Sequence, residues 1–86
     1  MKIKSGYILR QVAGEYVVVP TGEDLNLNMM ITLNETGAFL WKLMEQDTDE
    51  KAMVAALLEE YDVDEAAARA HVDTFVKKLK EQDFLA

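Results

Sequence analysis

Residues able to do chemistry are few in this chain and lie far apart. There is no cysteine and a single histidine, His71, which excludes disulfides, thiolate metal sites and His-rich metal sites. The only serine, Ser5, has no His, Asp or Glu near it in sequence, so neither a serine nucleophile nor a phosphopantetheine attachment site is indicated. We expect His71 to be a partly buried helix residue without a catalytic role.

Two acidic stretches have the composition of a cation site but not its spacing. Residues 59–60 and 62–65 are rich in Asp and Glu, yet they lack the glycine and the terminal glutamate of a calcium loop. Helix capping explains these carboxylates better. The four glycines are isolated from one another, which excludes a phosphate-binding loop. We therefore expect a protein that is not an enzyme and that carries no metal or cofactor.

Length and charge limit the number of domains and the kinds of partner that the chain can have. The 86 residues are enough for one domain spanning 1–86, and the net charge is −7. Acids dominate residues 23–68, whereas residues 69–80 carry four cations and one acid. An acidic chain disfavours nucleic acid as a partner. No stretch has the length and apolarity of a signal peptide or a membrane span, so we expect a cytoplasmic protein with no membrane partner.

The first third of the chain has the pattern of strands. Residues 7–12 and 15–20 are rich in β-formers and flank Ala13-Gly14, which predicts a hairpin. Pro20 suits a strand end because it has no N–H. An apolar residue stands at every second position from Leu25 to Leu33, which predicts a third, half-buried strand.

The rest of the chain has the period of three helices. We expect Asn34, Thr48 and Asp64 to be their N-caps. The first helix is apolar on most of its surface and should be central. The buried stripes expected for the second and third helices are Met53, Val54, Leu57, Leu58 and Tyr61, and Ala68, Val72, Phe75, Val76 and Leu79. Phe84 and Leu85 follow as a tail that can fold back on the core.

The element order β-β-β-α-α-α predicts an α+β fold with helices on one face of an antiparallel sheet. In a simple meander the third strand lies at an edge and can accept a strand from another chain. One flank of the third helix carries Val76, Arg69 and Lys80 with Asp73 beyond, and the other carries His71 and Lys78. We expect a groove with an apolar floor and a basic lip between the third strand and one flank of the third helix, and the residues alone leave open which flank that is. An ordinary solvated helix face is the alternative for any single lysine.

One string is more specific. Residues 33–43, LNETGAFLWKL, with the hairpin, the 25–33 strand and Tyr61-Asp62-Val63-Asp64, resemble the PqqD-like family of pyrroloquinoline quinone biosynthesis protein D over about residues 6–85. The resemblance implies a winged helix-turn-helix-like fold. It also implies a recognition element, or peptide chaperone, for the leader segment of a ribosomally synthesised precursor peptide. The final product is left open, since relatives serve peptides other than the quinone precursor.

In that family the leader adds as a fourth strand beside the third strand, lies against the third helix, and is presented to a modifying enzyme, often a radical S-adenosylmethionine (SAM) enzyme. The residues expected to bind it here are Asn28, Met29, Met30, Ile31, Thr32, Arg69, Val72, Asp73, Val76 and Lys80.

Two other functions remain open from the residues. A winged-helix DNA-binding regulator is disfavoured by the charge but not by the cations of the third helix. A structural subunit docked permanently on an enzyme would use the same sheet. The exposed edge also allows either a monomer or a strand-exchanged dimer.

Overall fold

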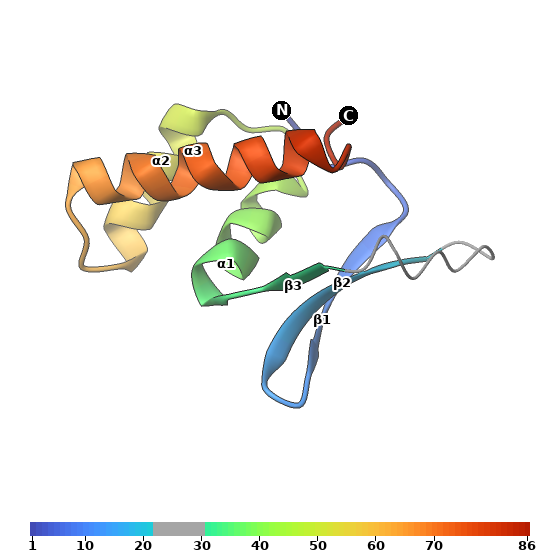
Figure 1. Cartoon of the computed structure of the whole chain (residues 1–86). Coiled ribbons are helices and arrows are strands. Elements are labelled where there is room, and N and C mark those ends of the chain that lie inside the picture. The colour runs from blue at the N-terminus through green and yellow to red at the C-terminus, as the bar shows by residue number, and fades with distance from the viewer. Residues whose placement is uncertain (22–30) are drawn as a thin grey trace.

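A computed structural model describes residues 1–21 and 31–86. Its elements are β1 (Tyr7–Val12), β2 (Glu15–Pro20), β3 (Ile31–Leu33), α1 (Glu35–Met44), α2 (Glu50–Glu60) and α3 (Glu65–Glu81). The strands form one antiparallel sheet in the order β1-β2-β3, and the three helices lie to one side of it (Figure 1). This confirms the expected α+β order and agrees with a winged helix-turn-helix-like fold.

The hairpin has the predicted bounds. Tyr7 pairs with Pro20 and Val12 with Glu15, so Ala13 and Gly14 form a two-residue turn. Both turn residues have positive φ, 52° and 83°, the backbone that a type I′ turn requires. Glycine adopts this conformation without penalty, whereas alanine does so at a cost. Pro20 stands at the strand end, where the expectation placed it.

Of the predicted third strand, the structure describes the last three residues as β3. Val18 faces Ile31 and Tyr16 faces Leu33 across the β2–β3 pair. The part of that prediction covering residues 25–30 lies outside the described residues.

Side-chain caps fix where the helices begin. Asn34 and Asp64 accept hydrogen bonds of 2.7 Å from the backbone N–H groups of Gly37 and Ala67, as expected. The expectation for the second helix is wrong by one residue. Asp49, not Thr48, is its N-cap, with Oδ1 accepting from the Ala52 N–H at 2.7 Å. The Thr48 N–H instead donates to the carbonyl of Met1.

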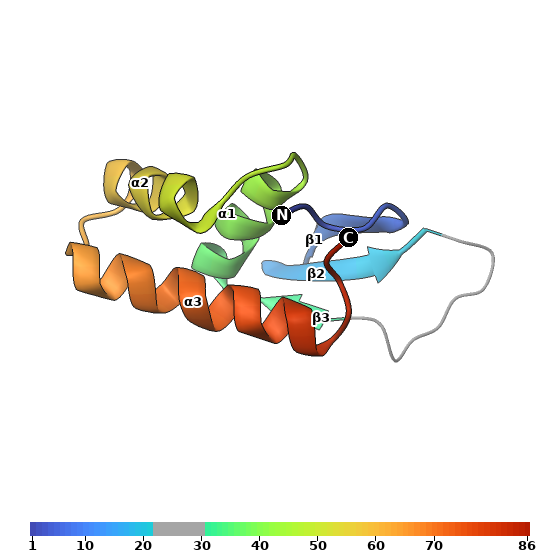
Figure 2. The same cartoon turned by 90° about the horizontal axis from the view of Figure 1, so that it is seen from above.

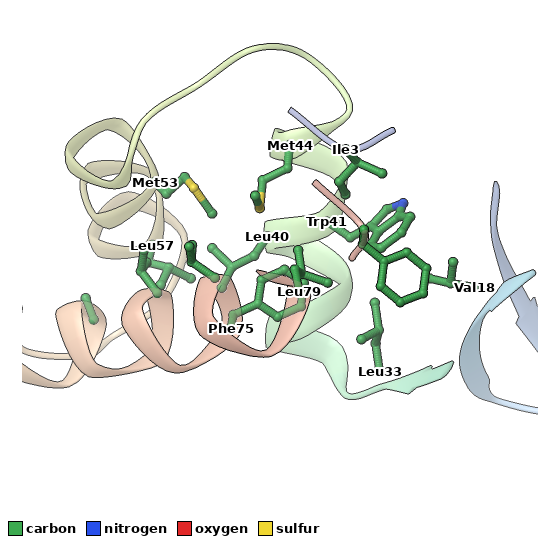
Figure 3. Close-up of a cluster of buried hydrophobic side chains, with 14 residues drawn as sticks. Ile3, Val18, Leu33, Leu40, Trp41, Met44, Met53, Leu57, Phe75 and Leu79 are labelled. Atoms are coloured by element: carbon green, nitrogen blue, oxygen red, sulfur yellow. The ribbon is translucent and has the colours of Figure 1, made fainter. Parts of the chain in front are cut away.

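The core gathers side chains from all three helices, the sheet and both ends of the chain. Figure 3 shows Leu40, Leu57 and Phe75 in one cluster with Val18 and Leu33. The predicted stripe of α3 is buried throughout, and Phe84 folds back to 1% exposure. The stripe predicted for α2 is too wide. Met53 and Leu57 are buried there, but Leu58 is 41% exposed.

The two ends of the chain pair with each other. Ile3 forms a β-bridge with Leu85, and the Ile3 N–H donates to the carbonyl of Met44 at 2.9 Å. The ammonium group of Met1 donates to the Asp47 carboxylate at 2.8 Å, and this hydrogen bond lowers the pKa of that carboxyl group. These contacts tie the end of α1 to the segment after α3 (Figure 2).

Candidate peptide-binding site

The outer edge of β3 is the first component of the candidate site. The described strands place β3 last in the sheet, with β2 on one side and no described strand on the other. Leu33 is buried, Ile31 is half-buried and Thr32 is exposed. An edge strand carries outward N–H and C=O groups that can pair with an added strand. As far as the described residues go, an extended peptide can therefore pair with the backbone at this edge.

A hollow of about 520 Å³ separates this edge from α3, and we call it the β3–α3 hollow. Its walls come from β3, the start of α1 and one flank of α3. The residues that line it are Thr32, Leu33, Asn34, Thr36, Gly37, Leu40, Ala70, His71, Thr74, Phe75 and Lys78.

The charge of this hollow is opposite to that of the protein. Among the described residues, Lys78 and His71 are the only ionisable ones that line it, and both are exposed. No Asp or Glu of residues 1–21 and 31–86 lines it, although the chain has 16 acidic residues. The floor is formed in part by Leu33, Leu40 and the buried Phe75. The hollow therefore has an apolar floor and a basic lip, and it lies on the flank of α3 that carries His71 and Lys78.

The structure separates the residues that were predicted to bind peptide. Ile31 and Thr32 are in β3, and Thr32 lines the hollow. Val72 and Val76 are buried to 1% and 2% exposure, and neither lines the β3–α3 hollow. Lys80 is exposed but is not among the residues lining the hollow. Three further predicted residues, Asn28, Met29 and Met30, lie outside the described residues.

Arg69, Val72 and Asp73 line a different hollow, between α2 and α3. The flank of α3 that lines the β3–α3 hollow carries His71, Thr74 and Lys78, whereas the residues predicted to bind peptide came mostly from the Arg69 flank. Helical periodicity does reveal both flanks. It does not determine the direction in which α3 crosses the sheet, and that direction decides which flank meets β3.

A third hollow, of about 650 Å³, lies where the hairpin meets the β3–α1 junction. It includes Glu15, Tyr16 and Glu35, so its charge is acidic.

Tyr61 packs edge to face on Phe39, with ring centroids 5.5 Å apart. Burial raises the pKa of the Tyr61 phenol, and the nearby Glu35 carboxylate adds to that effect.

Other kinds of site find little support in the part of the chain that the structure describes. Within residues 1–21 and 31–86, no three His, Asp or Glu side chains come close enough to hold a metal ion. None of the described helices combines the length and apolarity needed to cross a membrane.

Two solved structures share the fold. One, titled "TbiB1 in Complex with the TbiA(beta) Leader Peptide", has a TM-score of 0.77 and 22% identity, covering 99% of this chain and 94% of that one. The other, "Lasso peptide synthetase B1 complexed with the leader peptide", has a TM-score of 0.72 and 19% identity, covering 93% and 89%. No curated protein matches.

The family comparison covers most of the chain. The sequence model of "Coenzyme PQQ synthesis protein D (PqqD)" matches residues 15–85. That range includes β2, β3 and all three helices, and with them every described residue of the β3–α3 hollow. The match confirms the resemblance carried by residues 33–43, and the chain belongs to the PqqD family.

Proposed function

We propose that this protein binds the leader segment of a ribosomally synthesised precursor peptide and presents it to a modifying enzyme of the radical SAM class. The leader adds as a strand to the outer edge of β3 and lies in the β3–α3 hollow. One observation carries the proposal: a strand edge without a described neighbouring strand borders a hollow whose floor is apolar and whose described ionisable residues are His71 and Lys78. Both similar structures are titled as complexes with leader peptides, which supports it.

The chemistry of the site indicates how a leader is recognised. Backbone hydrogen bonds to β3 supply affinity with little demand on sequence, and side chains at alternate leader positions enter the hollow. Apolar leader residues contact Leu33 and Phe75, and an acidic residue meets Lys78. Because exposed ion pairs contribute only about 0–1 kcal/mol each, the apolar contacts dominate affinity.

DNA binding is the weaker alternative. The four cations of α3 do not all share one face. At 100° per residue Arg69, Lys77 and Lys80 lie within about 80° of one another, whereas Lys78 points about 180° away from Arg69 and lines the hollow on the other flank. The Arg69 guanidinium also donates to the Glu65 carboxylate at 2.8 Å, which neutralises it locally. Phosphate recognition needs several cations on one surface. We expect no shift of duplex DNA by this protein at physiological ionic strength.

The direct test uses synthetic leaders made from short open reading frames that neighbour the gene, with scrambled peptides as controls. Amide chemical-shift mapping of the full chain should show changes in β3 and along the His71 to Lys78 part of α3. Changes confined to α2 would contradict the proposal.

Strand addition has its own test, which leaves the protein unaltered. Successive N–H groups of a β-strand point to opposite edges, so only alternate leader amides can pair with β3. Two leaders are N-methylated, one at odd and one at even positions across the binding segment. We expect one to lose binding and the other to retain it. Equal binding of both would exclude strand addition.

Presentation to an enzyme is tested separately. A radical SAM enzyme encoded beside this chain should modify the precursor faster when this protein is present. A protein variant that no longer binds leader should remove that acceleration. Acceleration that persists without leader binding would refute the presentation step.

A further inference from the structure

A hollow larger than the β3–α3 hollow lies away from the strand edge, between α2 and α3, and we call it the α2–α3 hollow. Its volume is about 770 Å³. Its apolar lining comes from Val54, Ala55 and Leu58 of α2 and Val72 of α3. Leu58 is one of only two large hydrophobic residues that are exposed among the described residues, at 41%. The hollow therefore places an unpartnered leucine at its surface.

Charges at the rim set this hollow apart from the β3–α3 hollow. Arg69 is held by Glu65 at 2.8 Å, so this pair adds little net charge. Glu50 and Asp73 remain without an ion pair within the described residues, against the single cation Lys51. The α2–α3 hollow is consequently acidic, whereas no described acidic residue lines the β3–α3 hollow.

The two hollows lie on opposite flanks of α3. An α-helix turns about 100° per residue, so Asp73 and His71 point about 160° apart. Asp73 lines the α2–α3 hollow and His71 the β3–α3 hollow. A ligand in one hollow leaves most of the other free, since Ala70 alone lines both.

We infer that the α2–α3 hollow is a docking site for a helix of a second protein that presents leucine-like side chains beside lysine or arginine. A pair of helices forms a groove that suits a third amphipathic helix. The acidic rim selects basic flanking residues, and the same acidity disfavours a second copy of this chain, whose net charge is −7. This inference rests on the proposed function. The modifying enzyme binds the domain through the α2–α3 hollow while the leader lies on the other flank of α3.

The test uses two synthetic helical peptides as probes. Both carry leucines along one face, and the flanking positions are lysines in one peptide and glutamates in the other. Titrated into the full chain, the lysine peptide should shift amides of α2 and of α3 around Asp73. The glutamate peptide should bind at least about tenfold more weakly. Equal binding of the two peptides, or shifts confined to the β3 edge, would overturn the inference.

Two surface variants locate the contact. Leu58→Asp and Asp73→Lys each change an exposed residue, so both proteins should fold and give dispersed spectra. Each should weaken binding of the lysine peptide by about fivefold or more. Unchanged affinity in both variants would refute this site.

The same variants separate this inference from the proposed function. Leader binding should be unchanged in Leu58→Asp and Asp73→Lys, because neither residue lines the β3–α3 hollow. If leaders fail to bind the wild type while the lysine peptide binds at α2 and α3, the proposed function is refuted and the α2–α3 hollow is confirmed as a docking site. If leaders bind and the lysine peptide does not, the inference alone falls.

Discussion

The indole ring of Trp41 and the phenyl ring of Phe84 pack edge to face, with ring centroids 5.7 Å apart and an angle of 77° between their planes. Tyr7 contacts the same phenyl ring from the sheet side, with centroids 4.8 Å apart. Phe84 thus joins α1, β1 and the segment after α3, although it belongs to no helix or strand. Edge-to-face pairs stabilise beyond the area that they bury.

Phe84→Ala should therefore destabilise the fold strongly. We expect a loss of about 3–5 kcal/mol in the free energy of unfolding, close to the whole stability of a small domain. Leu58→Ala is the matched control on an exposed position and should cost about 0.5 kcal/mol or less. Urea unfolding followed by circular dichroism measures both. A Phe84→Ala protein as stable as the control would show that the tail does not hold the core.

The start of α1 should show coupling between Asn34 and Gly37. A Cβ on Gly37 would lie 3.0 Å from the Asn34 Oδ1 that caps the helix. A Gly→Ala change within a helix normally raises the free energy of unfolding by about 1 kcal/mol. Here the Asn34 side chain must shift to make room, and loss of an N-cap lowers the free energy of unfolding by about 0.5–2 kcal/mol. We expect Gly37→Ala to give no gain, or a loss of about 1 kcal/mol.

The double-mutant cycle identifies the cause of that result. In the Asn34→Ala background the carboxamide is absent, so Gly37→Ala should recover up to about 1 kcal/mol. Additive effects of the two substitutions would mean that the Cβ does not disturb the cap.

The hairpin turn offers a stabilising change. Ala13 has φ 52° with a neighbouring Gly14 at 83°, and Asn-Gly is the preferred pair for such a turn. Ala13→Asn should raise the free energy of unfolding by about 0.5–1 kcal/mol, whereas the β-branched Ala13→Val should lower it. Thermal melts of the two variants measure this. A more stable Ala13→Val protein would mean that the turn is not left-handed.

Tyr61 should make stability depend on alkaline pH. Its pKa is raised above the ordinary value of 10.0 by burial first and by the nearby Glu35 second. The folded state therefore keeps the phenol protonated at a pH where the unfolded chain ionises. This contribution is complete below about pH 10 and is lost as the pH rises through the raised pKa. Tyr61→Phe should flatten the fall in unfolding free energy above pH 10, and identical slopes for the two proteins would contradict it.

Local signals in the sequence account for most of the fold. The β-rich runs around Ala13-Gly14 determine the hairpin, and Asn34 and Asp64 cap helices where they were expected. Thr48 failed as a cap because Asp49, one residue later, has the carboxylate that reaches the Ala52 N–H. Leu58 failed as a core residue because α2 buries only a narrow stripe, through Met53 and Leu57.

The site was less predictable, because it depends on contacts between distant segments. The alternation of residues 25–33 indicates a strand. Because this strand follows the hairpin in a simple meander, it is expected at the edge of the sheet. Which flank of α3 lies opposite that edge depends on the direction in which the helix crosses the sheet. The hydrophobic periodicity of the sequence does not determine this direction. His71 and Lys78 were visible as a second flank, but only the fold places them beside β3.

The two flanks of α3 give the sharpest prediction about the leader. Lys78 lines the β3–α3 hollow, and Arg69 lies across the helix in the α2–α3 hollow, paired with Glu65. Both are exposed cations on the same helix, so their reversal to glutamate changes the net charge equally. An exposed pair contributes about 0–1 kcal/mol, and reversal adds repulsion of similar size. Lys78→Glu should therefore weaken the binding of an acidic leader about threefold to tenfold, whereas Arg69→Glu should weaken it less than about twofold.

Titration calorimetry with one leader and both variants measures this difference at matched ionic strength. Raising the salt concentration should reduce the Lys78→Glu effect, because exposed charges are screened within about 10 Å at 0.1 M salt. Replacing the acidic leader residue by glutamine should remove it altogether. Equal losses in Lys78→Glu and Arg69→Glu would mean that net charge, and not the β3–α3 hollow, attracts the leader. A larger loss in Arg69→Glu would place the leader on the opposite flank of α3.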